Sequence, residues 1–101
     1  MPYIPPQLRP DLDQHIAALA EAINSAAAEI DGDAAYAGLL NYSCTRLALE
    51  TMPARRYWAI ATTSGVFHNI ADEFYRRFAG PYEDEQIARN GDVYDTATEL
   101  G

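Results

Sequence analysis

The chain has 101 residues and a formal net charge of −8, with 15 acidic side chains against seven basic ones. This length is typical of one domain, and the charge disfavours general binding to DNA, RNA or membrane surfaces, which are themselves anionic. A single cysteine, Cys44, excludes an intramolecular disulfide and a thiolate metal cluster. Since the sequence has neither a secretory leader pattern nor an apolar run of membrane-spanning length, we expect a cytoplasmic protein, in a bacterium or a phage-infected host cell.

The first third of the sequence predicts an arm followed by a helix. Residues 1–10 contain four prolines, which predict an extended, polyproline-like arm. A helix is then predicted from about Asp11 to Ile30, ended by Gly32. Its apolar side chains recur at helical spacing, namely Leu12, Ile16, Leu19, Ile23 and Ile30.

The remaining elements follow from caps and breakers. A second helix is predicted over 34–52, because Pro53 pushes the preceding residue out of the helical region. A third and longest helix is predicted over 54–79, with Gly80 and Pro81 as its stop. A short acidic helix over about 83–89 and a turn at Asn90-Gly91 complete the pattern.

These elements predict an all-α fold. We expect a single helical domain over residues 1–101, with three helices, an extended N-terminal arm, a short docked C-terminal helix and a loose tail at 95–101. The sequence is rich in alanine and carries seven tyrosines, so large core side chains are scarce. We therefore expect the chain to complete its burial as a homo-oligomeric bundle.

Paired arginines are the main candidates for ligand binding. All seven basic residues are arginine, whose planar fork suits phosphate or carboxylate. Arg55-Arg56 and Arg76-Arg77 lie at the two ends of the third predicted helix, about 31 Å apart along its axis. One chain cannot close both pairs on a small anion, but an antiparallel second copy could bring them together. Alternatively, Arg76 and Arg77 complement the end of the helix and pair with residues 83–85.

A polar patch in the middle of the third predicted helix offers a second candidate. Thr62, Thr63 and Ser64 precede Gly65, where a helix interior normally holds strong helix formers. This patch predicts either a tight crossing of two helices or a lining for a polar ligand. For a nucleotide-like ligand, aromatic side chains would stack on the base, and the candidates are Tyr75, Tyr82 and Trp58.

Enzymatic chemistry has little support in the sequence. Asp11/His15 and His68/Asp72 are carboxylate–imidazole pairs at helical spacing, but no third ligand is fixed, so no metal site or cofactor is predicted. Nucleophile elbows, phosphate-binding loops and dinucleotide-binding glycine patterns are absent, so no catalytic residue is assigned. A metal-dependent phosphohydrolase using Glu73, Glu83 or Asp84 stays as a third hypothesis.

Two resemblances extend these hypotheses. The N-terminal MPYIP and the C-terminal EFYRR…PYEDEQIARNGDVY resemble an uncharacterised family of short phage and prokaryotic helical proteins, which implies no particular activity. More weakly, Arg56, Ile60-Ala61, Thr63, Arg77, Ala79 and Pro81 are similar to a helix of phage anti-CBASS proteins. That second resemblance implies small helical oligomers that bind nucleotide signals between subunits without cleaving them.

We therefore expect a non-enzymatic, phage-type accessory protein that sequesters a nucleotide-like, phosphate-containing signalling molecule and so counteracts a host defence. The alternative is a protein-interaction module that binds a host or phage protein through an acidic, tyrosine-rich face. For sequestration the expected ligand-binding residues are Arg55, Arg56, Trp58, Thr62, Thr63, Ser64, Tyr75, Arg76, Arg77 and Tyr82.

Overall fold

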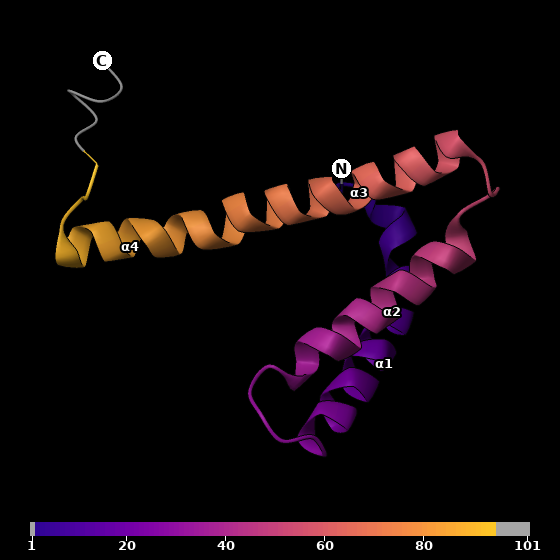
Figure 1. The fold of residues 1–101 in the computed structure, drawn as a ribbon, viewed down its shortest axis with the longest axis horizontal. Helices are drawn as coiled ribbons and strands as arrows, with labels where there is room; N and C mark the ends of the chain where they lie inside the picture. Colours follow the sequence, from indigo (N-terminus) through magenta and orange to yellow (C-terminus); the bar gives the residue numbers. More distant parts are fainter. Residues whose placement is uncertain (1, 95–101) are drawn as a thin grey trace. The chain divides into compact units, whose positions relative to one another are not determined.

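A computed structural model describes residues 2–94, and over this range the protein contains helices and no strand (Figure 1). The all-α prediction is therefore confirmed. The predicted loose tail at 95–101 lies outside the described residues. The elements are a 3₁₀ turn η1 (Pro6–Leu8), α1 (Arg9–Ala28), α2 (Ala35–Thr51), α3 (Tyr57–Phe74), a π-helical turn η2 (Tyr75–Ala79) and α4 (Gly80–Asn90).

The chain divides into two compact units, Met1–Ser64 and Gly65–Gly101. The single-domain prediction stays a prediction. The first unit holds the arm, α1, α2 and the start of α3, and the second holds the rest of α3, the π turn and α4. No helix in the described range is both long and apolar enough to cross a membrane.

The N-terminal arm is shorter than the sequence suggested. Only residues 2–5 lack regular structure, because the chain turns at Pro6–Leu8 and α1 already begins at Arg9. Pro6 favours this turn, since its fixed φ suits a helical first turn and its missing N–H leaves no donor unpaired. The Arg9 guanidinium donates through Nε (3.0 Å) and Nη2 (2.8 Å) to the Ile4 carbonyl oxygen, which holds the arm near the start of α1.

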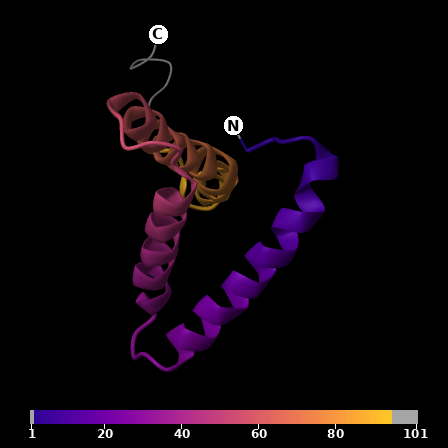
Figure 2. The same cartoon turned by 90° about the vertical axis from the view of Figure 1, so that its right-hand side faces the viewer.

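In the first unit, α1 and α2 form a helical hairpin (Figure 2). The connection runs through Gly32, whose φ of +107° is a conformation that side-chain-bearing residues rarely adopt. The two helices contact each other, and their half-buried residues are mostly small. They are Ile23, Ala26 and Ala27 on α1 and Ala35, Leu39, Ser43, Cys44 and Ala48 on α2.

The apolar stripe predicted on α1 is largely exposed. Leu12 and Ile16 keep 52% and 61% of their surface accessible. Within the described residues the only fully buried hydrophobic side chain is that of Ala59, at 1%. The hairpin buries chiefly its small-residue face, and most large apolar side chains in the described range stay exposed.

The predicted stop at Gly80-Pro81 is wrong, because helical structure continues from α3 through η2 into α4. The physical reason lies in the hydrogen-bond pattern before the proline. In a regular α-helix the ring of Pro81 would clash with the carbonyl four residues earlier and would leave it without a donor. The wider π turn relieves this conflict, and its closing bond runs from the Gly80 N–H to the Tyr75 carbonyl oxygen.

The third helix begins later than predicted and the fourth is longer. Residues 54–56 precede α3, so Pro53 delays helix formation to Tyr57.

The second helix, predicted over 34–52, is confirmed as α2. The Asn90-Gly91 turn is also confirmed, because Gly91 has a φ of +90° and donates its N–H to the Ile87 carbonyl oxygen at 2.8 Å.

If Pro81 causes the π turn, replacing it should restore a regular α-helix. We expect Pro81→Ala to raise the free energy of unfolding by roughly 1–3 kcal/mol, since alanine both donates an N–H and favours helix. Thermal unfolding followed by circular dichroism measures this change. Pro10→Ala is the matched control, because Pro10 also occupies the first turn of a helix and its replacement should be nearly neutral. A destabilised Pro81→Ala protein would contradict this cause.

Candidate functional site

The predicted ligand-binding residues fall into two groups, one in each unit. The first unit holds Arg55, Arg56, Trp58 and the polar patch 62–64. The second unit holds residues 75–77 and Tyr82. The expectation that both arginine pairs lie within one long helix is wrong, because Arg55 and Arg56 precede α3, and Arg76 and Arg77 lie in the π turn.

In the second unit, Arg76 is already engaged. Its Nη2 lies 2.9 Å and 2.8 Å from the two carboxylate oxygens of Glu73, one turn earlier. The arginine side chain is 67% exposed and that of Glu73 is 27% exposed, so this is a surface ion pair that contributes little to stability. Residues 83–85 were the partners predicted for Arg76, although the i, i+3 spacing from Glu73 to Arg76 could have indicated this ion pair.

Tyr75, the first residue of the π turn, interacts with α4. Its hydroxyl donates a hydrogen bond to the Glu83 carboxylate, and this bond, together with the negative charge of Glu83, raises the pKa of Tyr75 above its ordinary value of 10.0. A phenolate at this position would face an ionised carboxylate, so the neutral phenol is favoured. The π turn therefore carries a tyrosine whose ring is exposed and whose hydroxyl is oriented by a neighbouring acid.

Arg55, Arg56, Arg77 and Arg89 have no anionic partner within residues 2–94, and Arg9 binds only the Ile4 carbonyl oxygen there. Arg77 in the π turn makes neither a hydrogen bond nor an ion pair through its side chain there, and the same holds for Arg55 and Arg56. All three side chains are exposed. In a chain with 15 acidic and seven basic residues, such unpaired guanidinium groups leave full capacity to bind an anion.

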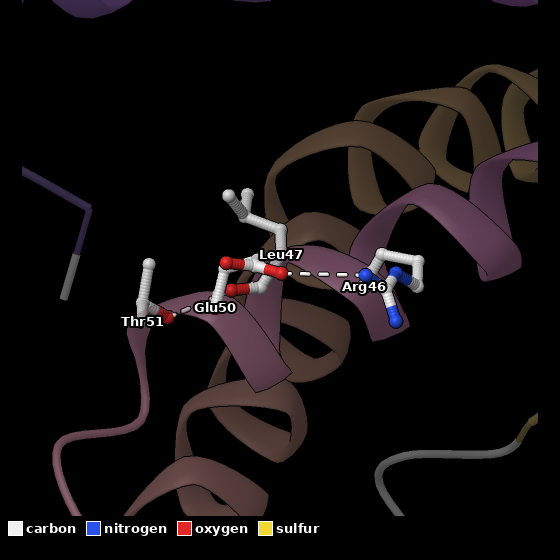
Figure 3. A network of polar contacts seen from close by, with 4 residues as sticks. All are labelled: Arg46, Leu47, Glu50 and Thr51. Carbon is white, nitrogen blue, oxygen red and sulfur yellow. Dashed lines mark hydrogen bonds and ion pairs between the residues drawn. The ribbon is translucent and has the colours of Figure 1, made fainter.

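Arg46 provides a contrast on α2 (Figure 3). Its Nη2 lies 3.3 Å from Oε1 of Glu50 at i, i+4, and Thr51 Oγ1 donates to the Leu47 carbonyl oxygen at 2.9 Å. Both members of this ion pair are more than half exposed. Arg46 is therefore an exposed arginine whose charge is already matched within its own helix, and it serves below as a control.

The polar patch on α3 has open space around it. Thr63 and Gly65 are half-buried, whereas Thr62 and Ser64 are exposed, and Trp58 keeps 57% of its surface accessible. No atom lies within 4 Å of the position that a Cβ on Gly65 would take, apart from the helix's own backbone. Within the described residues no neighbour therefore makes the tight crossing that Gly65 allows.

Two shallow hollows lie in the first unit, and neither is lined by a predicted site residue. One lies over α2 and is lined by Ala37, Gly38, Asn41, Tyr42 and Thr45. The other lies between the arm and α1, lined by Pro2, Tyr3, Ile4, Arg9, Leu12, Asp13 and Ile16. Neither hollow was predicted from the sequence, because each depends on backbone placement that the helical pattern does not encode.

Metal-binding capacity is equally limited in the described range. Over residues 2–94 no three histidine, cysteine, aspartate or glutamate side chains come close enough together to hold a metal ion. Cys44 is half-buried on α2. Within this range, no cluster of metal ligands therefore supports the hypothesis of a metal-dependent phosphohydrolase.

Comparison with known proteins shows a family over nearly the whole chain. A family model described as "Domain of unknown function (DUF6899)" matches residues 1–93. No curated protein and no solved structure matches the chain. The match accounts for the resemblance at both ends of the sequence and brings no assigned activity with it.

The Tyr75–Glu83 interaction predicts a measurable titration. Glu83→Gln should lower the pKa of Tyr75 towards 10, because the charge that disfavours the phenolate is removed. Because the pKa of Tyr75 is higher in the folded state, the free energy of unfolding keeps its full value below pH 10. It falls as the pH rises through the folded-state pKa. NMR titration of ¹³Cζ-labelled tyrosine, with Tyr75→Phe for assignment, measures this pKa. Glu85→Gln is the control and should leave it unchanged; an equal shift in both variants would refute the specific contact.

Proposed function

The chain belongs to the DUF6899 family, and we propose that it binds and sequesters a nucleotide-like, phosphate-containing molecule without cleaving it. The observation that carries this proposal is that Arg55, Arg56 and Arg77 are exposed and have no anionic partner in the described range, as is also true of Arg9 and Arg89. In so acidic a chain, guanidinium groups that remain unpaired are available to a phosphate, which they can hold through two parallel hydrogen bonds.

The surroundings of Arg77 support the same ligand chemistry. A π turn inserted into an α-helix recurs at functional sites, and here it carries an exposed tyrosine and two arginines in sequence. The aromatic faces of Tyr75 and of Tyr82, which is 61% exposed, are open for stacking on a base. The site proposed on the second unit is therefore Arg77 for phosphate, Arg76 after release from Glu73, and the two tyrosines for the base.

The first unit would supply the remaining contacts from another copy of the chain. Neither of the two hollows in the first unit is lined by Arg55, Arg56 or Arg77. We place the pocket between copies of the chain, in the homo-oligomer expected from the sequence. In that assembly Arg55 and Arg56 would add phosphate contacts, Trp58 would add a stacking surface, and Thr62, Thr63 and Ser64 would satisfy polar edges. Sequestration of a signal would fit a phage-type accessory protein that opposes a host defence.

Loss of an unpaired arginine should weaken binding. We expect Arg77→Ala to reduce affinity for a retained nucleotide roughly tenfold or more, since a hydrogen bond to a charged group contributes about 1.5–3 kcal/mol. Native mass spectrometry with a panel of cyclic and linear nucleotides identifies the ligand, and isothermal titration calorimetry then measures its affinity. Arg46→Ala is the control, because it removes the same charge from an arginine already paired with Glu50.

The outcomes of this experiment separate the hypotheses. Binding that is lost in Arg77→Ala and kept in Arg46→Ala supports the site. Equal binding in the wild type and in the Arg55→Ala, Arg56→Ala and Arg77→Ala variants refutes the assignment of these residues. No retained nucleotide across the panel refutes sequestration itself, and release of a shortened product would indicate an enzyme instead.

A second candidate function is a protein-interaction module. The observation in its favour is the exposure of tyrosines in this acidic chain, including Tyr57 at 84% and Tyr42 at 67%. Tyrosine offers a large contact area at low entropic cost and is enriched in protein interfaces. The sign of this function would be one defined protein bound at fixed stoichiometry, with no small molecule, and lost in Tyr57→Ala but not in Arg77→Ala.

A further inference from the structure

An aromatic stripe runs along the second unit and has no cover within it. Its members are spaced three and four residues apart, and their exposed fractions rise along the chain: Phe67 38%, Ile70 53%, Phe74 64% and Phe78 73%. The rings of Phe74 and Phe78 stack on each other at 5.2 Å between centroids, so the two side chains point the same way. We call these four residues, three phenylalanines and one isoleucine, the aromatic stripe.

The members of this stripe share one helix face. At about 100° per residue, positions 67, 70, 74 and 78 of an α-helix fall within roughly 80° of one another around the axis. Across the π turn the rings of Phe74 and Phe78 stack, so these two side chains stay on the same face. A continuous apolar seam on one helix face, with polar residues elsewhere, is what a pairing helix presents.

We propose that the aromatic stripe is the interface with a second copy of this chain, paired antiparallel. The charges beyond the two ends of the stripe carry the choice of partner and direction. Arg55 and Arg56 lie before it without anionic partners in the described range, and Glu83, Asp84 and Glu85 lie after it on α4. Parallel pairing would place like charges together at both ends, whereas antiparallel pairing places the arginines of one copy against the acids of the other.

The same charges select the register. If Arg56 lies opposite Glu85 of the second copy, the two-fold axis passes close to Ile70, and Phe67 then lies opposite Phe74 of that copy. This register buries all four members of the stripe against apolar or small side chains. It differs from the pairing considered from the sequence and from the phosphate-bound assembly proposed above, in which Arg55 and Arg56 of one copy meet Arg76 and Arg77 of another. Without an anion between them, two such pairs of cationic side chains would repel each other.

Cysteine cross-linking tests the direction and register. In a Cys44→Ser background, Ile70→Cys should form a covalent dimer upon oxidation or with a short bismaleimide, since the two copies of residue 70 flank the axis. Phe78→Cys should not, because in the antiparallel pair its equivalents lie far apart. Dimers with both variants would indicate parallel pairing and overturn the proposal. A dimeric protein that cross-links with neither variant would also overturn it, because its interface would lie elsewhere.

Sedimentation analysis tests the interface without any ligand. We expect the wild-type chain to be at least dimeric and Phe74→Glu to raise the dissociation constant by roughly 100-fold or more, because a charge would be buried in the apolar seam. Ile87→Glu is the control, because Ile87 is a similarly exposed apolar residue of the same unit that lies off the stripe. A monomeric wild type at about 100 μM would refute the proposal. Equal loss of association in both variants would refute the role of the stripe.

Charge exchange then tests the end contacts. Arg55→Glu with Arg56→Glu should weaken the dimer, and adding Glu83→Arg with Glu85→Arg should restore it, because opposite charges face each other again. Failure of the second pair to restore association would refute the proposed register. These experiments measure dimerisation without any nucleotide, so they test the interface independently of the proposed nucleotide binding.

Discussion

The described helices bury almost nothing within their own chain, and this constraint governs the rest of the structure. Ala59 is the only buried hydrophobic residue in the described range, while large apolar side chains of α1, α3 and α4 are accessible to water. Folding stability comes chiefly from apolar burial, which must offset a large loss of conformational entropy. Helices of this length are marginal alone, so their stability depends on what packs against these apolar faces.

The π turn is the second organising feature, and it follows from one proline. Pro81 removes a donor and adds bulk where a helix would otherwise continue, and the chain responds by widening the preceding turn instead of breaking. The resulting π turn lies between Phe74 and Phe78, whose rings stack, and holds Tyr75, Arg76 and Arg77 on an irregular stretch of backbone. One covalent constraint thus shapes both the proposed interface and the proposed ligand site.

The candidate site shows how far sequence reasoning reaches. The residue types could be identified from the sequence: arginines, a hydroxyl patch and aromatic side chains all favour an anion or nucleotide-like ligand. The partners of these residues could not be predicted. Glu73 holds Arg76, Glu83 orients Tyr75, and Arg9 fastens the arm to α1 by binding the Ile4 carbonyl oxygen. Each of these contacts depends on which side chains the backbone brings within hydrogen-bond distance, which the spacing of residues only suggests.

The sequence by itself determined the all-α class, the second helix to within one residue at each end, and the turn at Asn90-Gly91, because caps, breakers and helical periodicity act locally. Only the tertiary structure decided that the apolar stripe of α1 stays uncovered and that Gly80-Pro81 continues the helix. It also placed Arg55 and Arg56 before α3. The reason is physical: periodicity shows which face of a helix is apolar, but the cover for that face comes from residues or molecules distant in sequence.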